Sequence, residues 1–438
     1  MSNTITVDQA KLVLNAFCAT FQNNLLAAET VTWRKFDREM NDRNGLTVVE
    51  QVPPRYNVTQ TVNGVADFTA TGTQDTVFGS EQYRVDRIFG SSMGWGDYQK
   101  IKDIGDARES EAIKAAATQL AEQIDAYVLR EVALAANNWT GTPGNTVATF
   151  DDVANGYTRL KEEGVDDADL RAVLTYQDRQ ALADWIVDNN DSALSGAEGV
   201  YRAGFSGKVA GIPTMFTQQL PTLTTGTRAA TGGTINAANQ NVNYRDVAIS
   251  PAPGQYMTQL LNIRVSASGT ETLSDGDVFT IAGVNAYDNR LQASLGRLQQ
   301  FRVIGNYTAV AGVISNVRIY PAIIVPGTGT GKNPGVNTAN ATVTAVPANG
   351  AAITFLGGPA AQVRPRFVSQ KQAIVCNTAD LIMPATGIGM RKALTKVPLS
   401  VRMWKNSDFN TGQHNVRFDV AINANVRDRR RIVRINGA

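Results

Sequence analysis

Alternating apolar and polar residues in the middle of the chain constrain its fold more than any motif does. Leu261, Ile263 and Val265 alternate with polar residues, and this period of two is typical of a half-buried strand. A Ser-Asp-Gly turn at residues 274–276 then leads into a second apolar run, as turns that join strands do. The pattern predicts a complete small β-module within residues 261–324.

Two further strands are expected in the module, at Phe301–Ile304 and at Val313–Tyr320. The turn before the second strand calls for a positive φ at Gly276, which glycine adopts without a steric penalty. Turn-rich stretches with almost no charge flank the module, and between residues 321 and 363 the only charged residue is Lys332. A module bordered in this way indicates a domain inserted into a longer fold.

The overall composition describes a folded chain whose surface carries few charges. The chain has 438 residues, of which 43% are hydrophobic, and its formal net charge is +2. That balance argues against nucleic-acid binding by bulk electrostatics. Charged residues make up 18% of the chain, against about 25% in ordinary proteins. Such a surface suits a chain that buries much of it against copies of itself.

Neither the cysteines nor the N-terminus point to a secreted protein. Cys18 and Cys376 are isolated thiols, so buried free cysteines are expected rather than a disulfide framework. The first residues lack the basic and apolar regions of a secretory signal, and no run of about 18 apolar residues would span a membrane. The sequence therefore predicts a protein that is made and used in the cytoplasm.

The N-terminal residues predict a helix followed by extended chain. Thr6–Gln9 has the form of a capping box, and an apolar stripe follows at helical spacing. The prolines at 53 and 54 exclude a helix there, and Thr61–Gly96 has the composition of an extended, hairpin-like stretch. We expect an arm and a loop that need neighbouring chains to bury their apolar side chains. The helical stripe consists of Leu14, Phe17, Phe21 and Leu25.

A long amphipathic helix is predicted next. Asp106 can cap it, with Glu109 three residues on, and the turn Thr140–Gly144 follows its end. About 32 residues at about 1.5 Å each give a rod of about 48 Å. Its single narrow apolar stripe predicts packing along one side, across a sheet. The stripe consists of Ile113, Ala117, Leu120, Ile124, Val128, Val132 and Ala135.

The remaining elements alternate between helices and strands on both sides of the module, with no internal repeat of fixed period. Before the module we expect helices at Asp151–Glu163 and Asp178–Val187 and strands at Arg171–Tyr176 and Val209–Phe216. After the module we expect strands at Phe367–Ile382, Leu399–Lys405, Asn415–Ala424 and Arg430–Ile435.

The sequence offers little catalytic chemistry. The single histidine, His414, lies in a predicted turn and argues against His-dependent triads and multi-histidine metal sites. Residues 327–332 lack the spacing and the Ser or Thr of a phosphate-binding loop. Asp166–Asp169 lacks the glycine and distal glutamate of a calcium loop, so we expect a capping loop there. No cofactor and no metal are predicted, and an enzyme is the weakest class.

Five arginines near the C-terminus form the densest basic cluster. An alternating strand would place Arg429 and Arg431 on one face and Arg430 and Arg434 on the other. Such a cluster, which Arg427 completes, can face phosphates. Its members can equally pair with the chain's own acids or with a neighbouring chain, and the sequence leaves these alternatives open.

The order of these elements resembles that of tailed-bacteriophage major capsid proteins. An N-terminal arm, an extended loop, a long spine helix, an α/β body and a C-terminal return to that body cover nearly the whole chain. The chain resembles the coat proteins of short-tailed phages that carry an extra inserted β-barrel. Asp103–Asn138 resembles the spine helix, and Leu273–Val284, Phe301–Ile304 and Val317–Ile324 resemble barrel strands.

The resemblance implies an α+β fold with peripheral and axial domains and an inserted antiparallel β-barrel. No lysine lies between Lys35 and Lys100, so the covalent cross-link that some relatives form is not expected. The implied segments are an arm at 1–60, an extended loop at 61–97, the first part of the body with the spine helix at 98–222, the inserted barrel with flanking loops at 223–358, and the second part of the body at 359–438.

The resemblance also implies contacts between subunits. The extended loop would lie on a neighbouring subunit, the arm would strap another, and a loop at residues 243–257 would reach across between rings. The candidate contact residues are Arg84, Asp86, Arg87, Arg245 and Asp246.

The implied function is that of a non-enzymatic subunit of an icosahedral shell around the phage genome. The shell would form as a scaffolded procapsid in the host cytoplasm, expand when DNA is packaged and become part of the virion. The implied partners are further copies of the chain in pentamers and hexamers, a separate scaffolding protein, a portal protein, packaged double-stranded DNA on the inner face and a decoration protein, with no membrane.

Two other classes of protein remain open. A cellular protein-shell compartment of the same fold would explain self-association, but it would normally lack the inserted barrel. A carbohydrate-binding or surface-layer β-protein would explain the Thr- and Asn-rich middle of the chain. It should show a signal peptide and an aromatic-lined site, and neither is evident in the sequence.

Overall fold

The structure consists of two compact units, each built from three segments of the chain. The first unit combines residues 1–48, 83–131 and 374–427, and the second combines residues 49–82, 132–373 and 428–438. Both contain helices and strands, so the predicted α+β class is confirmed. The computed structural model describes residues 2–36, 47–58, 76–96, 106–189, 207–249, 252–327, 334–384, 386–408 and 413–437.

Helix α1 (Ser2–Asn24) begins earlier than the sequence predicted. Thr6 lies inside the helix, whereas a capping residue has a non-helical backbone, so the predicted capping box is wrong. No proline or glycine precedes Thr6 to stop the helix, which explains why it extends to Ser2. The short helix α2 (Ala27–Thr30) follows.

The apolar stripe of α1 is buried within the chain itself. Leu14, Phe17, Phe21 and Leu25 are all at most 5% exposed, and the ring of Phe17 stacks on that of Phe418 with centroids 3.9 Å apart. The expectation that these side chains need a neighbouring chain is therefore wrong. The sheet of the same unit supplies the apolar surface, and burial of a phenylalanine contributes about 2–3 kcal/mol.

A six-stranded sheet forms the centre of the first unit. Its order is β1-β20-β23-β22-β21, β4 also pairs with β23, and β1 is parallel to β20. Two of the C-terminal strands predicted from the sequence, at 399–405 and 415–424, are confirmed. The strands are β1 (Thr32–Lys35), β4 (Ile88–Gly96), β20 (Ile374–Ala379), β21 (Ile388–Ala393), β22 (Ser400–Asp408) and β23 (Gln413–Val426).

The long helix α4 (Asp106–Ala135) has 30 residues, close to the predicted length. Every residue of its predicted apolar stripe is buried. Tyr127 packs its ring against Phe89 of β4, with centroids 5.3 Å apart, and donates a hydrogen bond to Asn423 Oδ1 of β23 at 2.6 Å. The predicted packing across a sheet is confirmed, while the side chains of the predicted cap at Asp106 lie outside the described residues.

A buried carboxylate joins α4 to the start of α2. Asp125 is 0% exposed, and its two oxygens accept hydrogen bonds from the backbone N–H groups of Leu26 (2.8 Å) and Ala27 (2.7 Å). Burial raises the pKa of Asp125 to about 7, against the opposing effect of these two N–H groups. One side chain of the long helix thus fixes the entry of the chain into α2.

The second unit contains another six-stranded sheet, ordered β5-β24-β19-β6-β8-β7. Helix α5 (Phe150–Glu162) begins with a capping box between Thr149 and Asp152, and α6 (Tyr176–Asn189) follows β6. Both helices were predicted with slightly different ends. The strands are β5 (Asn138–Thr140), β6 (Leu170–Leu174), β7 (Lys208–Val209), β8 (Ile212–Phe216), β19 (Arg366–Gln370) and β24 (Ile432–Ile435).

Three predicted strands are interrupted by turns. Residues 209–216 form the hairpin β7–β8 instead of one strand, because Ala210 and Gly211 adopt positive φ angles of 51° and 77°. Residues 367–382 divide at a 3-10 turn, η1 (Lys371–Ala373), into β19 and β20, which join different sheets. Residues 430–435 begin with a second 3-10 turn, η2 (Arg429–Arg431).

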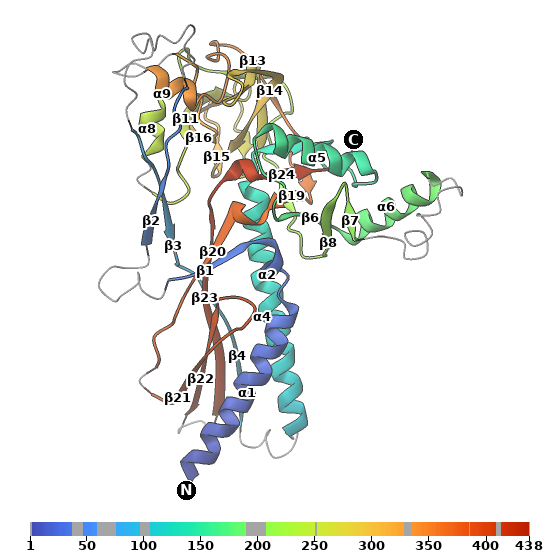
Figure 1. Cartoon of the computed structure of the whole chain (residues 1–438), viewed down its shortest axis with the longest axis vertical. Helices are drawn as coiled ribbons and strands as arrows, with labels where there is room; N and C mark the ends of the chain where they lie inside the picture. Colours follow the sequence, from blue (N-terminus) through green and yellow to red (C-terminus); the bar gives the residue numbers. More distant parts are fainter. Residues whose placement is uncertain are drawn as a thin grey trace, which may run out of the picture. The chain divides into compact units, whose positions relative to one another are not determined.

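The predicted β-module is a closed antiparallel barrel, drawn in yellow and orange at the top of Figure 1. Its cyclic order is β10-β11-β16-β14-β13-β17. The alternation at 261–265 and the strands at 301–304 and 313–320 are confirmed, whereas β10 and β17 were not predicted. The strands are β10 (Gly233–Ile235), β11 (Gln259–Arg264), β13 (Val278–Asp288), β14 (Ala293–Val303), β16 (Val313–Tyr320) and β17 (Ala352–Phe355).

Aromatic and branched side chains fill the barrel. Phe279, Phe301 and Phe355 meet in its core, with Phe279 5.7 Å from Phe301 and 5.5 Å from Phe355 between ring centroids. Gly276, in the turn before β13, has a φ of +91°, as predicted. A Cβ at this position would lie 2.8 Å from Leu134 Cδ2, so the turn requires glycine for space as well as for backbone geometry.

A charged pair is buried at one end of the barrel. Arg228 Nη2 lies 3.3 Å from Asp277 Oδ1, and the two side chains are 0% and 1% exposed. Arg228 also donates to the carbonyl oxygens of Gly357 (2.8 Å) and Leu356 (3.1 Å), while Asp277 accepts from the backbone N–H of Gly226 at 3.1 Å. The pair therefore fixes the chain before β10 against the chain after β17.

Short paired segments surround the barrel. The chain enters and leaves it beside β9 (Leu223–Thr224) and β18 (Gln362–Val363), which pair with each other. The pair β12 (Thr272–Leu273) and β15 (Tyr307–Thr308) is antiparallel, and helices α8 (Tyr244–Ala248) and α9 (Pro334–Ala339) complete the region.

The region expected to be one extended loop contributes to two sheets. Strand β3 (Gly79–Arg84) pairs with β2 (Thr47–Val52), whereas β4 pairs with β23. A hairpin between β3 and β4 is therefore absent from the described residues. Residues 61–75 and 97 of this region lie outside them.

Candidate functional site

Three of the five predicted contact residues lie together in the first unit. Arg84 Nε is 2.8 Å from Asp86, and the two side chains are 53% and 37% exposed. Asn423 donates a hydrogen bond to Asp86 at 2.8 Å, and the guanidinium of Arg87 lies 4.6 Å from the centroid of the Tyr127 ring. The sheet and α4 thus position this group while its charged ends remain exposed. Its role as a contact between subunits stays a prediction.

The other two, Arg245 and Asp246, lie on helix α8 in the second unit. Both are exposed, whereas Tyr244 and Val247 on the same helix are buried. The backbone N–H of Met257 donates to Val247 O at 3.0 Å, so the described part of the segment 243–257 folds back on its own chain. Arg245 and Asp246 lie on the exposed side of α8, and their role as a contact between subunits stays a prediction.

The C-terminal arginines are bound within the chain. Arg430 and Arg431 pair with Asp428 at 2.9 Å and 3.3 Å. Arg429 donates to Gly254 O at 3.0 Å. The predicted alternation is wrong for these three because they lie in a 3-10 turn, and pairing with the chain's own acid is the alternative that the structure supports.

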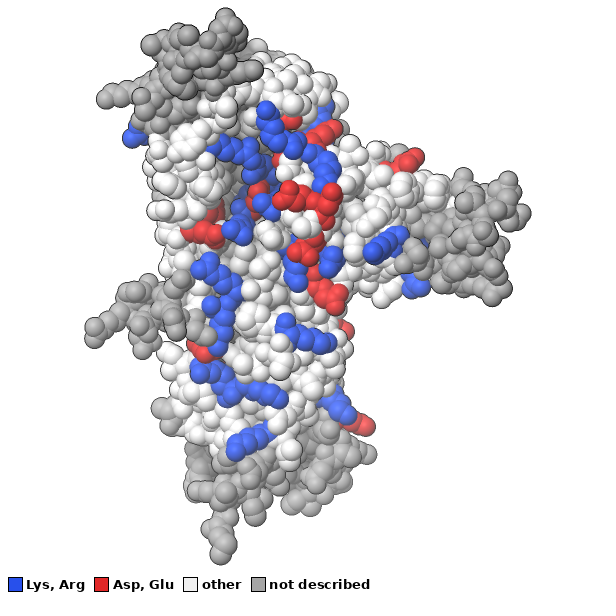
Figure 2. Space-filling model, in the orientation of Figure 1, with Lys and Arg blue, Asp and Glu red and all other residues white. Residues whose placement is uncertain are grey.

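Arg434 is 1% exposed and lies in β24. It donates to the carbonyl oxygens of Ala133 at 2.7 Å and Gly276 at 2.8 Å, and burial lowers its pKa to about 10. In this conformation it is not available to phosphate groups. On the face drawn in Figure 2, Lys and Arg are interspersed with Asp and Glu over the barrel and α5, so no field of a single sign covers that part.

The barrel is attached to the sheet of the second unit by specific polar contacts. The amide of Gln300 in β14 accepts from Trp139 N at 2.6 Å and donates to Trp139 O at 2.9 Å. Because Trp139 lies in β5, this pair of bonds joins a barrel strand to the edge of the sheet. The indole of Trp139 donates to Asn436 at 2.8 Å, and Arg434 lies 5.0 Å from its ring centroid.

A second attachment joins the barrel to the end of α5. Arg297 of β14 lies 2.7 Å from Glu162 and 3.2 Å from Glu163. All three side chains are at least two-thirds buried, where an ion pair is screened less than on the surface. The contacts of Gln300 and Arg297 attach β14 to β5 and to the end of α5.

The described residues offer no catalytic arrangement that we can recognise. Burial raises the pKa of the Cys18 thiol to about 11 and raises that of Cys376 as well, so neither forms the reactive thiolate readily. Among the described residues no group of three or more His, Cys, Asp or Glu could hold a metal ion. Within that part of the chain, no helix is long and apolar enough to cross a membrane.

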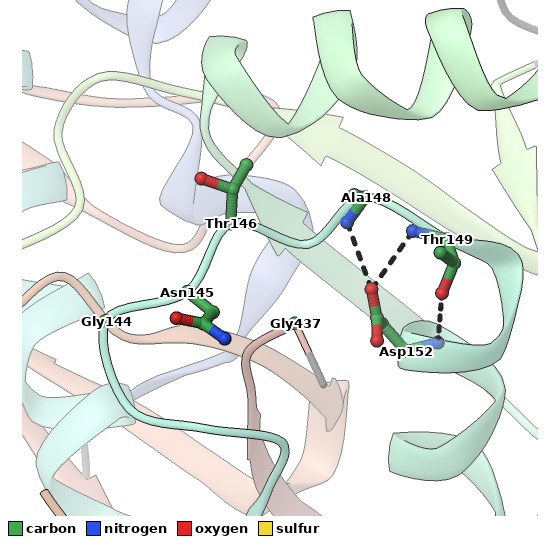
Figure 3. A pocket seen from close by; sticks show the side chains of 7 residues that line it. All are labelled: Gly144, Asn145, Thr146, Ala148, Thr149, Asp152 and Gly437. Carbon is green, nitrogen blue, oxygen red and sulfur yellow. Dashed lines mark hydrogen bonds between the residues drawn. The ribbon is translucent and has the colours of Figure 1, made fainter.

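A small polar pocket lies at the start of α5 (Figure 3), lined by residues 144–146, 148, 149, 152 and 437. Its one carboxylate, Asp152, already accepts hydrogen bonds from the backbone N–H groups of Ala148 and Thr149, each at 3.0 Å. These bonds serve the helix cap, so the pocket has no acid or base poised toward a ligand.

The remaining sequence motifs are the single histidine, the aspartate-rich loop and the glycine-rich run. His414 lies in β23, opposite Ser407, rather than in a turn. Asp167 accepts a hydrogen bond from Tyr157 at 2.8 Å and pairs with Lys161, in a loop before β6 as predicted. Most of the glycine-rich run at 327–332 lies outside the described residues.

A sequence model described as "P22 coat protein - gene protein 5" matches residues 3–430. The chain belongs to the P22 coat protein family. The predicted class, a bacteriophage coat protein, is thereby confirmed. No curated protein matches the chain at a significant level.

Several solved phage structures are similar to this coat-family chain. One from Mycobacterium phage Che8 is 11% identical, covering 94% of this chain and 92% of that chain, with a TM-score of 0.45. A capsid structure of the cyanophage P-SCSP1u is 11% identical, covering 94% and 88%, also with a TM-score of 0.45. The mature capsid of bacteriophage PhiM1 is 8% identical, covering 94% and 87%, with the same TM-score. The family assignment rests on the sequence model.

The residues that position this coat-family subunit's barrel were not predicted from the sequence. Gln300 and Arg297 lie in a recognisable strand, but their partners Trp139 and Glu162 are more than 130 residues away. Arg434 was considered only as a charge on a strand face. Gln300 is adjacent to Phe301 in the strand, where alternation places a polar residue on the opposite face, so nothing in the strand pattern singled it out.

Proposed function

We propose that this chain is the major capsid protein of a tailed bacteriophage, which assembles with copies of itself into an icosahedral shell around the genome. The observation that carries the proposal is the coat protein family match across residues 3–430. The coat protein family match also supports a structural, non-enzymatic role for the chain.

We further propose the assembly route that the family resemblance implies. Pentamers and hexamers form in the host cytoplasm around a separate scaffolding protein and a portal protein. The procapsid then expands as double-stranded DNA fills it, and a decoration protein is a further candidate partner. The group of Arg84, Asp86 and Arg87 and the pair Arg245 and Asp246 are our candidate contacts between subunits.

We also propose that residues 223–358 are an insertion into a body formed by residues 98–222 and 359–438. Two pairings support this division. Strand β19, after the barrel, pairs with β6, before the barrel. Leu223 and Val363 are register partners at the base of the barrel, so the chain leaves and returns at neighbouring positions.

Electron microscopy of the purified protein, produced with its scaffolding protein, tests the proposal. Closed icosahedral particles of uniform diameter are expected. A monodisperse monomer at high concentration, with scaffold supplied, would overturn it. Time-resolved imaging after scaffold removal should show expansion of the particles, and shells of unchanged diameter on DNA filling would contradict the proposed route.

A further inference from the structure

Strand β3 and the segment 252–257 are joined by a buried carboxylate. Glu81 of β3 is 4% exposed. Its Oε1 accepts a hydrogen bond from Gly254 N at 2.5 Å, and its Oε2 accepts one from Tyr256 N at 3.1 Å. Both oxygens of the side chain are thus used to hold the backbone of one short segment, and hydrogen bonds to a charged acceptor are about twice as strong as neutral ones.

The same segment is held from its other side. Arg429 donates to Gly254 O at 3.0 Å, so two buried charged side chains hold the N–H and the C=O of a single residue. Gly254 has a φ of +72°, which fits the tight path of the backbone between them. Arg429 itself packs 5.4 Å from the ring centroid of Tyr320, at the end of a barrel strand.

Close packing adds to these bonds. A Cβ on Gly79 would lie 2.4 Å from Cε2 of Tyr256, so the ring of Tyr256 rests directly on the backbone of β3. Ser80 forms a β-bridge with Ile249, next to α8. At the end of the segment, Met257 O accepts a hydrogen bond from Ala322 N at 2.8 Å, which ties the segment to the chain that follows barrel strand β16.

Two regions that the family resemblance assigns to contacts between subunits are therefore linked inside one subunit. Strand β3 belongs to the extended loop at 61–97, and the segment belongs to the loop at 243–257. We infer that Glu81 couples these two contact regions, so that the position of β3 fixes the position of α8 and the segment 252–257 during shell assembly. This inference rests on the proposed function.

The coupling has a consequence for shell geometry. The angle between neighbouring subunits depends on the relative positions of the surfaces that touch. If Glu81 and Tyr256 set that relation, loosening either contact gives particles of mixed diameter or open sheets, while each subunit still folds. A residue with a purely structural role would lower the melting temperature without changing the diameter of particles formed below it.

Two substitutions test the coupling through independent contacts. Glu81→Gln removes the charged acceptor, and Gly79→Ala pushes the ring of Tyr256 away without touching Glu81. Glu111→Gln, at an exposed position on α4, is the matched control. Particle diameters are measured by electron microscopy, subunit melting by calorimetry, and exposure of the Gly254 and Tyr256 amides by hydrogen exchange.

We expect both variants to exchange the Gly254 and Tyr256 amides at least tenfold faster and to broaden the distribution of particle diameters, with Glu111→Gln unchanged. Uniform particles of wild-type diameter from both variants, with faster exchange at these amides, would overturn the coupling. Wild-type exchange rates in Glu81→Gln would overturn the assignment of the bonds. Failure of the wild-type protein to form particles would instead overturn the proposed function.

Discussion

Two buried carboxylates, Asp277 of the barrel and Asp125 of the first unit, are held in different ways. In the barrel, Arg228 faces Asp277 at 3.3 Å with both side chains removed from solvent. In the first unit, Asp125 is equally buried but is bound by the backbone N–H groups of Leu26 and Ala27. A carboxylate bound in this way can shed its charge by taking up a proton, whereas an arginine cannot neutralise itself in the same manner.

The barrel pair and Asp125 should therefore lose stability under different changes. Burial raises the pKa of Asp277 and lowers that of Arg228, while their attraction opposes both shifts. Removing both charges from water costs free energy when the protein folds. Removing only one of the two side chains destabilises the protein more, because the other charge then stays buried without a partner. The carboxylate of Asp125 should instead make the unfolding free energy of the first unit depend on pH.

Breaking the ion pair of Arg228 and Asp277 should reduce the stability of the protein more than the other changes considered. Arg228→Met leaves Asp277 buried without its cation, and we expect the barrel to lose about 3–5 kcal/mol of unfolding free energy. Arg264→Met, on an exposed position of β11, is the matched control and should change little. Denaturant unfolding followed by hydrogen exchange of barrel amides measures both. A loss below about 1 kcal/mol in Arg228→Met would contradict the importance of the pair.

Substitution of Gly276, in the turn before β13, should cause the second largest loss of stability. Gly276→Val forces a positive φ on a branched residue and pushes a Cβ into Leu134, so we expect a loss of about 2–4 kcal/mol from strain and overpacking together. Gly283→Val provides the comparison, because Gly283 has a φ of +78° and a Cβ there would meet nothing within 4 Å. It should lose about 1–2 kcal/mol from strain alone. Equal losses in thermal unfolding would show that the contact with Leu134 contributes nothing.

Asp125 should make the first unit sensitive to pH. Its native pKa of about 7 lies above the ordinary value of 3.8, so the native state holds the proton more tightly than the unfolded state. Its contribution to stability is present in full below about pH 4 and is lost as pH rises through 7. The decline should approach about 1.4 kcal/mol per pH unit at most.

The substitution Asp125→Asn should flatten this decline, whereas Asp184→Asn, at an exposed position on α6, should leave it unchanged. Hydrogen exchange of the Leu26 and Ala27 amides across pH 4–8, corrected for intrinsic rates, provides the measurement. Parallel pH profiles for Asp125→Asn and the wild type would show that Asp125 does not titrate in this range.

The smallest effect on the isolated subunit is expected at the exposed pair of Arg84 and Asp86. Surface ion pairs contribute about 0–1 kcal/mol, so Arg84→Ala should barely change the melting temperature of the monomer. If the pair touches a neighbouring subunit, the same change should slow assembly measured by light scattering. Assembly at the wild-type rate would remove Arg84 from the candidate contacts.

Local patterns in the sequence predicted those helices and strands whose conformation depends on residues close by in the chain. The alternation at Leu261–Val265 and the stripe along α4 were sufficient, because periods of 2 and 3.6 are direct consequences of backbone geometry. The turn at Gly276 was also predictable, since its sequence permits few other conformations. The barrel strands β10 and β17 were missed because three or four residues are too short to show a period.

Pairings between distant segments could not be predicted in the same way. Residues 367–382 were predicted to form one strand, yet β19 and β20 enter different sheets. The stripe of α1 was correctly recognised as apolar, but the identity of its partner, Phe418, depends on a strand about 400 residues away. Arg434 likewise has the sequence context of a surface charge, and only the fold brings the carbonyl groups of Ala133 and Gly276 around it.

The pairing of Leu223 with Val363 has a consequence for the evolution of such subunits. Paired residues on antiparallel strands lie about 5 Å apart, a gap that a two-residue hairpin turn can span. If residues 223–358 are an insertion, as we propose, the barrel could be gained, lost or exchanged as a cassette in a single genetic event. A gene joining these two ends by a short turn would encode the barrel-free form of the subunit, ready to be expressed and compared.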